Sequence, residues 1–227
     1  MDLKNRSAIS IIEKKISVIG LGKSGYAATI LAHYLGGKVF ASDLGNTTEI
    51  LYRACQLRQK GIKCETGQHS NQIYDADLWV VSPGIPKEAD IIIKAQKYNI
   101  PIVGEIEFAS WFTETPIIAV TGSNGKTTTV HILAAMCQAD FIKGKLAGNM
   151  GIPFSEIIID EIKYPDPNRV YILEISSFQM EFIHHFKPII GIFLNISPDH
   201  LDRHKTMAEY VAMKLNMVKN QTSGDAI

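Results

Sequence analysis

The chain has 227 residues, of which 46% are hydrophobic, and its 23 basic and 23 acidic side chains give a formal net charge of zero. A chain of this length and hydrophobicity can bury a core, either in one large domain or in two small ones. Because charges of both signs are interspersed, neither nucleic acid nor an anionic membrane surface is an expected partner. Any phosphate group would have to be bound by a local site.

Residues 1–15 lack the continuous apolar run of a signal peptide, and the longest apolar run, at residues 189–194, is too short to cross a bilayer. We therefore expect a soluble cytoplasmic protein. The three cysteines, Cys55, Cys64 and Cys137, form no C-x-x-C pair. We expect them to be reduced and mostly buried thiols without a metal or redox role.

A glycine-rich turn follows the first predicted strand. Residues 15–19 are apolar and lead into Gly20-Leu21-Gly22-Lys23-Ser24-Gly25, which opens a segment with helical spacing, and a second predicted strand at 38–42 ends at Asp43. This order of strand, glycine turn, helix, strand and acid is the dinucleotide fingerprint, in which a pyrophosphate lies at the helix N-terminus. Taken alone, the pattern predicts an NAD-binding oxidoreductase.

Another predicted strand of the N-terminal half, residues 78–81, ends at Ser82-Pro83-Gly84-Ile85-Pro86. Open α/β sheets bind ligands at the carboxyl ends of their strands, although Pro-Gly is equally common in an ordinary turn. Strands and helices alternate up to residue 112, and residues 113–116 predict a linker. We therefore expect a first domain over residues 1–112 and a second over residues 113–227.

The second half opens with a phosphate loop. Residues 117–120 predict a strand, residues 130–136 a helix, and Thr121-Gly122-Ser123-Asn124-Gly125-Lys126-Thr127-Thr128 lies between them. Glycine backbone N–H groups, the helix N-terminus and Lys126 suit phosphate oxygens, and Thr127 or Thr128 can offer a hydroxyl to Mg²⁺. The loop is a shortened relative of the usual pattern, because Val120 stands where the first glycine is expected.

Polar residues follow two later predicted strands. Residues 170–173 end at Glu174, which suits a Mg²⁺ ligand or a water-orienting base, the alternative being a strand-end glutamate that faces solvent. The strand predicted at 189–194 leads to a loop that carries Asp199, His200 and His204. The i, i+4 spacing of the two histidines fits zinc, but no third soft ligand is evident. A helix is predicted over residues 206–219, and a turn into a further strand over residues 222–227.

Together these motifs resemble the Mur ligase family, the ATP-dependent amide-forming enzymes of peptidoglycan precursor synthesis. The eight segments that carry the likeness are 20–25, 82–86, 104–107, 121–128, 148–151, 174–179, 195–204 and 210–214. The resemblance implies an α/β fold: a Rossmann-like N-terminal domain with a parallel sheet, then a phosphate-loop ATP-binding α/β central domain that is incomplete here. By the same resemblance, we expect the family's C-terminal amino-acid-binding domain to be missing from these 227 residues.

Within the family the motifs most resemble the members that join D-glutamate to UDP-N-acetylmuramoyl-L-alanine through an acyl phosphate. The resemblance implies that the parent protein is such a ligase, acts as a monomer in the cytoplasm and consumes ATP, while these 227 residues are inactive alone. Three alternatives stay open: a member of the family that adds another amino acid, an NAD-binding oxidoreductase, and a non-enzymatic nucleotide-binding or regulatory module.

The resemblance also implies roles for individual residues. It assigns catalysis to Lys126, Glu174, His200 and Lys214, and ATP to Gly122, Ser123, Asn124, Gly125, Lys126, Thr127 and Thr128. It assigns the muramoyl nucleotide to Gly22, Lys23, Ser24, Asp43, Leu44, Ser82, Pro83, Gly84, Asn149, Ser176, Gln179 and His200. One Mg²⁺ would be held by Thr127 and Glu174 and a second by Glu174, His200 and a carbamate on Lys214.

Overall fold

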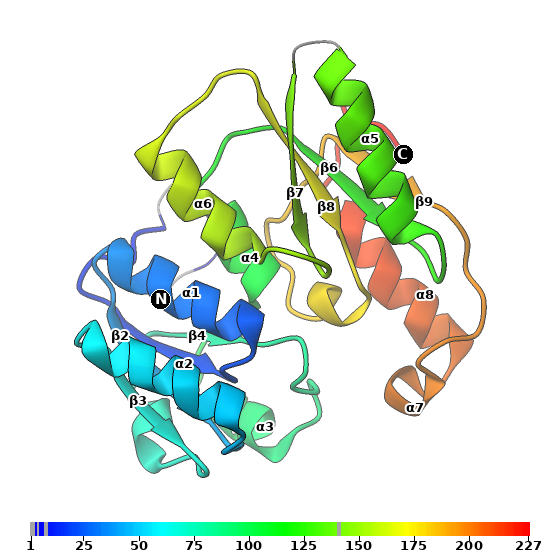
Figure 1. Ribbon diagram of the computed structural model, residues 1–227. Coiled ribbons are helices and arrows are strands. Elements are labelled where there is room, and N and C mark those ends of the chain that lie inside the picture. The colour runs from blue at the N-terminus through cyan, green and yellow to red at the C-terminus, as the bar shows by residue number, and fades with distance from the viewer. Residues whose placement is uncertain (1–2, 4, 7–8, 140–141) are drawn as a thin grey trace. The chain divides into compact units, whose positions relative to one another are not determined.

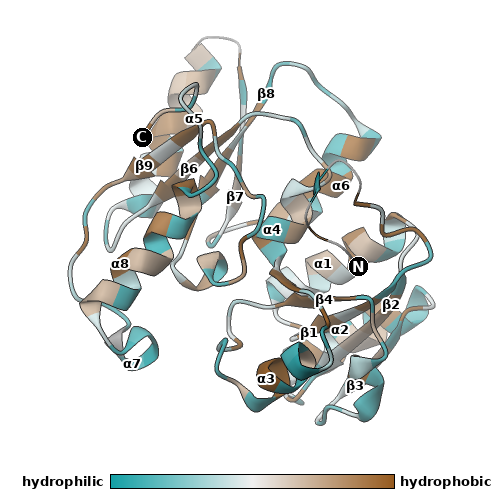
Figure 2. Cartoon of the chain, turned by 180° about the vertical axis from the view of Figure 1, so that it is seen from behind, coloured by the Kyte–Doolittle hydropathy of each residue, from teal (hydrophilic) through white to brown (hydrophobic). Residues whose placement is uncertain are grey.

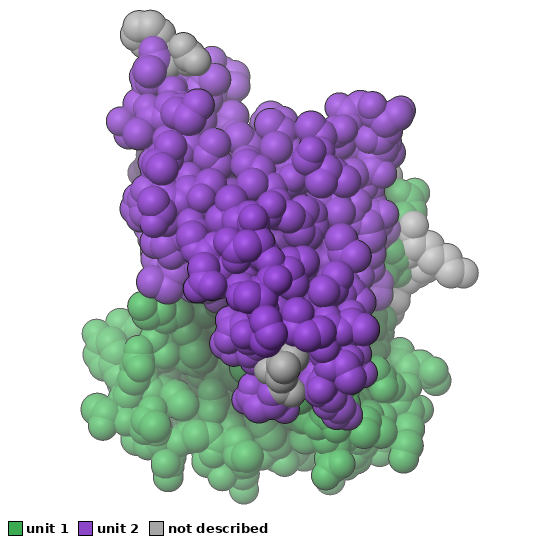
Figure 3. Space-filling view, turned by 90° about the vertical axis from the view of Figure 1, so that its right-hand side faces the viewer, with its two compact units in different colours: residues 1–111 green, residues 112–227 purple. Residues whose placement is uncertain are grey.

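The computed structural model describes residues 3, 5–6, 9–139 and 142–227. The chain divides into two compact units, Met1–Trp111 and Phe112–Ile227, so the division lies one residue before the boundary expected from the sequence (Figure 3). Each unit is built around its own parallel sheet (Figure 1).

The first unit alternates strands and helices around a five-stranded sheet of order β3-β2-β1-β4-β5, in which all neighbours are parallel. Its strands are β1 (Lys15–Ile19), β2 (Lys38–Asp43), β3 (Lys63–Thr66), β4 (Leu78–Val81) and β5 (Ile102–Gly104). Its helices are α1 (Lys23–Tyr34), α2 (Thr48–Gln59), α3 (Asp90–Lys97) and α4 (Glu105–Ser110). This is a doubly wound order that reverses between β1 and β4, and a ligand crevice is expected at the carboxyl ends of these two strands.

The second unit has a four-stranded parallel sheet of order β7-β8-β6-β9. Its strands are β6 (Ile117–Thr121), β7 (Lys143–Gly148), β8 (Arg169–Glu174) and β9 (Ile190–Phe193). Its helices are α5 (Lys126–Ala139), α6 (Phe154–Lys163), α7 (Leu201–His204) and α8 (Met207–Leu215). The central strand β6 lies between β8 and β9, so the phosphate loop at its end has neighbours on both sides.

Apolar runs explain the central strands of both sheets. All four residues of β4 are buried. In the second unit, Val130 and Ala134 of α5 form one buried cluster with Val120 of β6 and Ile172 of β8. Strands that are covered on both faces read as continuous apolar runs, and Figure 2 shows the brown of hydrophobic residues concentrated there. Among the described residues, no helix is both long enough and apolar enough to cross a membrane.

Three details differ from the sequence-based expectation. The loop after β9 contains the short helix α7, and α8 ends at Leu215, where a 3₁₀ turn, Asn216–Val218, continues the chain. The cysteines are free, as expected, but the prediction that they are mostly buried is wrong, because Cys55 is exposed and the other two are half-buried. Cys137 packs at the edge of the hydrophobic cluster around Val120 and Ile172.

Residues 222–227 make only an isolated parallel bridge, Ile190 with Ala226, where the sequence predicted a turn into a further strand. The bridge lies on β9, on the side of this strand that faces away from β6. The bridge is parallel, as are all strand pairs of this sheet.

Candidate functional site

In the first unit, the turn from β1 into α1 requires glycine at Gly20 and Gly25. Gly20 has φ +90°, and a Cβ on Gly25 would lie 1.8 Å from the carbonyl oxygen of Gly20. Gly22 caps α1 without any side-chain hydrogen bond, so the N–H groups of the first helical turn are left for a ligand. Exposed Lys23 and half-buried Ser24 lie in this first turn. The arrangement suits an anion such as a pyrophosphate.

Asp43 ties this glycine turn to the end of β2. Its Oδ2 accepts a short hydrogen bond from the backbone N–H of Leu21, and its Oδ1 accepts one of 2.7 Å from the N–H of Gly45. The Ser82 hydroxyl donates to the carbonyl of Gly20 at 3.0 Å, which joins the end of β4 to the same turn. Both sequence-predicted residues therefore shape the crevice at the point where the strand order reverses.

A cavity of about 450 Å³ lies in this crevice. Its apolar wall includes Leu44, Ile85 and Pro86, and its polar lining includes Asp43 and His69. Gly22, Ser82 and Gly84 also line it, so the cavity brings together most of the residues predicted to bind a nucleotide in this unit. His69, in the loop after β3, had not been singled out from the sequence.

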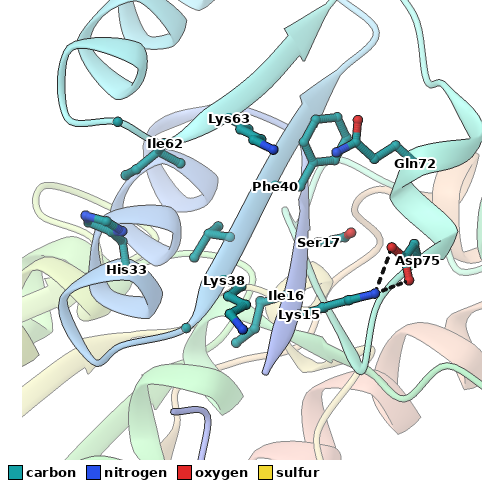
Figure 4. A pocket seen from close by; sticks show the side chains of 13 residues that line it. Lys15, Ile16, Ser17, His33, Lys38, Phe40, Ile62, Lys63, Gln72 and Asp75 are labelled. Carbon is teal, nitrogen blue, oxygen red and sulfur yellow. Dashed lines mark hydrogen bonds and ion pairs between the residues drawn. The ribbon is translucent and has the colours of Figure 1, made fainter. Parts of the chain in front are cut away.

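A second cavity of the first unit, of about 440 Å³, lies at the amino ends of β1, β2 and β3, away from the glycine turn (Figure 4). Lys15 reaches Asp75 here at 2.7 Å, as the dashed lines of Figure 4 mark, and His33 and Phe40 form other parts of the lining. None of the sequence-predicted site residues lies in it, and it is at the sheet edge opposite to the one where α/β folds bind ligands.

In the second unit, the phosphate loop joins β6 to α5. Gly125 has φ +85°, a conformation that favours glycine, and Lys126 is the first residue of α5. The Lys126 ammonium donates to the carbonyls of Gly122 and Ser123, both at 2.9 Å. The lysine thus folds back over the loop, at the position where a phosphate would lie.

The segment after β9 holds the phosphate loop from one side. Asn124 and Asn195 exchange hydrogen bonds of 2.9 and 3.0 Å. The Ser123 hydroxyl donates to the carbonyl of Ser197 and accepts from its N–H, both at 2.9 Å, and also lies 3.1 Å from the hydroxyl of Tyr210. The loop is therefore fixed by the β9 end and by α8 rather than by its own glycines alone.

Glu174 lies at the centre of the polar cluster beside this loop. It ends β8, is 2% exposed, and accepts from the Thr127 hydroxyl at 2.7 Å and from the Asn149 amide at 2.9 Å. Gly148 pairs with Glu174 across the sheet, and a Cβ there would lie 2.2 Å from its carbonyl oxygen. The sheet register therefore brings together three residues that the sequence predicted separately. The alternative of a solvent-facing glutamate is excluded by its burial.

Ser176 and Gln179 form a small turn just beyond Glu174. The Gln179 carbonyl oxygen accepts from the N–H of Ser176 at 2.9 Å and from its hydroxyl at 3.2 Å. Gln179 is 4% exposed, so its side chain shapes the turn while Ser176 is the more accessible of the two.

Lys214 reaches the phosphate loop from α8. Its side chain is almost fully buried, its ammonium donates to the carbonyl of Gly122 at 3.0 Å and to the Thr121 hydroxyl at 3.3 Å, and it lies 4.7 Å from the ring centre of Tyr210. Burial, and then the nearby Lys126 charge, lower the pKa of Lys214 to about 8. In the part of the chain described, none of the ion pairs involves this lysine.

His200 comes from the loop after β9. It is exposed, has φ +53°, packs its ring 4.8 Å from that of Phe178 and lies 3.4 Å from Asp199. His204 is instead buried and lies 2.8 Å from the Ser177 hydroxyl, so the two histidines have different surroundings. Within the described ranges, no group of three or more His, Cys, Asp or Glu side chains is placed to hold a metal.

Family models match both halves of the chain. One described as "Mur ligase MurD-like, N-terminal domain" matches residues 14–104, and one described as "Mur ligase middle domain" matches residues 120–227. The chain belongs to the Mur ligase family. The nicotinamide-dependent alternative rests on the glycine fingerprint of the first half alone, whereas the Mur ligase models match both halves.

Curated relatives give a finer comparison. A UDP-N-acetylmuramoylalanine–D-glutamate ligase of Koribacter versatilis is 41% identical over 213 residues, which are 93% of this chain and 46% of that protein. The ligase of the same name from Pelodictyon phaeoclathratiforme is 39% identical over an alignment of 232 residues, which covers the whole of this chain and 47% of that protein. This Mur ligase chain therefore spans about half the length of the curated relatives it matches.

Solved structures agree on the fold. The UDP-N-acetylmuramate:L-alanyl-gamma-D-glutamyl-meso-diaminopimelate ligase from Neisseria meningitides matches with a TM-score of 0.60 at 19% identity, over 93% of this chain and 69% of that one. The UDP-N-acetylmuramate-alanine ligase from Thermotoga maritima matches with a TM-score of 0.53 at 23% identity, over 90% and 46%. At these identities the likeness extends to the fold alone.

Proposed function

We propose that this chain is the N-terminal and central part of a ligase that joins D-glutamate to UDP-N-acetylmuramoyl-L-alanine in the cytoplasm and uses ATP. The names of the curated relatives support the choice of substrates. The observation that carries the proposal is the convergence of Lys126, Thr127, Glu174 and Lys214 around one phosphate loop. A site that combines a mobile cation, a hydroxyl and a buried carboxylate suits phosphoryl transfer from a nucleotide.

The first unit would hold the uridine-diphosphate end of the muramoyl substrate. Its uncapped α1 N-terminus, with Lys23 and Ser24, suits the diphosphate, and the cavity beside Asp43 and Leu44 suits the uracil. The turn at Ser82 would close the uridine pocket. The N–H groups of the glycine turn would bind the diphosphate of the uridine nucleotide in the same way as they would bind the pyrophosphate of NAD, because backbone N–H groups do not distinguish between pyrophosphates.

The second unit would hold ATP along residues 122–128 and the muramoyl end of the substrate at Asn149, Ser176 and Gln179. Thr127 and Glu174 fit a Mg²⁺ ion, because both present oxygen atoms and already lie within hydrogen-bond distance of each other. A bound Mg²⁺ would neutralise charge on the phosphates. Lys214 fits a second ion only after it takes up CO₂ as a carbamate, which converts an ammonium that repels Mg²⁺ into an oxygen anion.

The substrate carboxylate would attack the γ-phosphorus of ATP, which forms an acyl phosphate and releases ADP. The amine of D-glutamate would then attack the acyl carbon, lose a proton and expel phosphate. Lys126 would leave the carbonyls of Gly122 and Ser123 to hold the transferring phosphoryl group. His200 would join Glu174 and Lys214 at the second metal site, and its neighbours in the free chain are Phe178 and Asp199.

Calorimetric titration of the chain with UDP-N-acetylmuramoyl-L-alanine, with NAD in a parallel titration, tests the proposal. We expect saturable binding of the muramoyl nucleotide, weakened by Ser24→Ala, and no binding of NAD. A monomer is expected in the same solution. Binding of NAD alone would overturn the assignment.

The catalytic part of the proposal is tested on the coding sequence extended to the length of the curated relatives. We expect ADP release that depends on both the muramoyl nucleotide and D-glutamate for the extended protein, and none for the 227-residue chain. If another amino acid supports faster ADP release than D-glutamate, the chain belongs to a different branch of the family.

A further inference from the structure

The nucleotide cavity of the first unit is lined by two polar side chains that the proposed function leaves unused, half-buried His69 and exposed Asp90. Leu44, Ile85 and Pro86 give the cavity an apolar wall, against which a flat base can pack, and His69 adds a polar group to its lining. His69 is half-buried and comes from the loop after β3, next to the end of β2. Its ring is therefore held at the base end of the crevice rather than in solvent.

A chain of hydrogen bonds fixes which ring nitrogen of His69 carries the proton. The Ser42 hydroxyl, which is fully buried, lies 2.8 Å from Glu65 Oε1 and 2.7 Å from His69 Nδ1. A carboxylate can only accept, so the single hydroxyl proton of Ser42 goes to Glu65. Ser42 must then accept from His69, which places the ring proton on Nδ1.

The other ring nitrogen of His69, Nε2, is consequently an acceptor. Burial lowers the pKa of His69, which keeps the ring neutral, against the opposing effects of Glu65 and Asp43. Glu65 Oε1 also accepts from the N–H of Ser70 at 2.8 Å, so the carboxylate is itself held in place. The loop thus offers a fixed neutral acceptor to whatever lies in the cavity.

Two carboxylates also line the cavity: Asp90 is exposed at the start of α3, and Asp43 is already hydrogen-bonded to the backbone. Each of its carboxylate oxygens receives an N–H group, one from Leu21 and one from Gly45. An acid at this position of an α/β fold typically takes ribose hydroxyls with its remaining lone pairs. Reading of the base itself then falls to a different side chain.

We propose that His69 selects uracil by accepting the N3–H of the base at Nε2, with Ser42 and Glu65 as the residues that position it. Uracil carries a hydrogen on N3 whereas cytosine presents a lone pair there, so a fixed acceptor attracts the first base and repels the second. The inference rests on the proposed function, because it requires that the first unit binds a uridine nucleotide.

The test compares the affinities of UDP, CDP and 2′-deoxy-UDP for the 227-residue chain by calorimetry. We expect wild-type protein to prefer UDP over CDP by at least about tenfold, as one hydrogen-bond readout allows. In His69→Asn the amide nitrogen can still donate to Ser42, but no atom stands at the Nε2 position. The UDP-to-CDP preference should then fall close to one, while His69→Gln, which places an amide oxygen near Nε2, should restore part of it.

Two further variants serve as controls, one for histidine replacement in general and one for a failure of His69→Asn to fold. His33→Asn makes the same replacement at an exposed histidine of the opposite cavity and should leave the preference unchanged. Ser42→Ala keeps the His69 ring but frees its tautomer, so the preference should decrease even if His69→Asn fails to fold. The melting temperature of each variant reports its folding.

Each other outcome has a defined meaning. If His69→Asn retains the UDP-to-CDP preference, or if the wild type has no such preference, the inference is wrong while the uridine site stands. If His69→Asn instead loses the distinction between UDP and 2′-deoxy-UDP, the histidine contacts ribose and not the base, which also overturns it. If the wild type does not bind UDP at all, the proposed function of the first unit fails as well.

Discussion

Lys126 and Lys214 donate to the same acceptor, the carbonyl oxygen of Gly122, at 2.9 and 3.0 Å. Two ammonium groups that share one carbonyl repel each other, and the Lys126 charge contributes to the low pKa of Lys214. An anion placed between them would relieve this repulsion. The phosphate loop is therefore arranged for an anionic ligand at some expense to the stability of the free protein.

Replacing Lys214 with methionine should stabilise the chain. Lys214 is buried and has a pKa of about 8 in the folded protein, so keeping it charged at pH 7 is unfavourable. Methionine has a similar length, carries no charge and can pack against Tyr210. We expect the free energy of unfolding, measured with urea at pH 7, to rise by about 1–3 kcal/mol. A decrease would mean that the hydrogen bonds of Lys214 outweigh its burial.

The same lysine should impose a pH dependence with a definite sign. Its pKa falls from 10.5 in the unfolded chain to about 8 in the folded one, so the unfolded chain binds more protons between these values. The free energy of unfolding of the wild type should therefore increase as the pH rises from about 8 to 10.5. Below about pH 8 the destabilisation caused by burying the charged ammonium is fully present. The advantage of Lys214→Met over the wild type should shrink from pH 8 to pH 10. An advantage that grows with pH would contradict the assignment.

Glu174→Gln should weaken nucleotide binding only when Mg²⁺ is present. The amide keeps the size of the side chain but removes the negative charge that suits the metal beside Thr127. We expect the affinity for a fluorescent ATP analogue to fall by about tenfold or more with Mg²⁺ and to change little with EDTA. Glu156→Gln, on the exposed side of α6, is the matched control. Equal losses under both conditions would indicate a structural role.

Lys126→Ala should separate the two ligand sites of the chain. The change removes a cation that now covers the phosphate loop, so the affinity for ATP should fall by about tenfold or more. Binding of UDP should be unaffected, because the glycine turn that suits it is part of the other unit. Parallel titrations with ATP and UDP check this. Loss of both ligands would mean that they compete for one site.

The sequence predicted the parts of the site that depend on local order. A strand, a glycine turn and a helix in succession can be recognised from local sequence, and residues 20–25 and 121–128 each join a strand to a helix in this way. Glu174 could be placed beside Thr127 because adjacent parallel strands end at one edge. These contacts follow from backbone geometry, which a short stretch of sequence encodes.

The parts that the sequence did not predict depend on contacts between distant segments. The role of His69 follows from Ser42 and Glu65, on neighbouring strands, and the hydroxyl of Tyr210 reaches Ser123 across 87 positions of sequence. No spacing rule links such residues. His200, in the loop after β9, stays a predicted metal ligand, and its ring packs on Phe178. Side-chain direction in an irregular loop is set by packing that the sequence alone does not reveal.

Replacement by alanine should affect the melting temperature differently at two glycines of the turn between β1 and α1, Gly22 and Gly25. In Gly25→Ala the new Cβ would lie 1.8 Å from the Gly20 carbonyl oxygen and 2.7 Å from the Ser82 hydroxyl, so the turn must open. Gly22→Ala meets no atom within 4 Å, and its φ of −60° is open to any residue. We expect Gly25→Ala to abolish UDP binding and to lower the melting temperature, and Gly22→Ala to keep the melting temperature.

The alanine variants of Gly22 and Gly25 also distinguish a loss of UDP contact from a disruption of packing in the turn. Gly22 lines the nucleotide cavity, so a methyl group there can reduce UDP affinity without any loss of stability, whereas Gly25 acts through the backbone that it touches. Calorimetry with UDP and thermal melting, applied to both variants, distinguish the two effects. If Gly25→Ala melts like the wild type and binds UDP normally, the turn is looser than the 1.8 Å approach requires, and its fit to a pyrophosphate would have to be reconsidered.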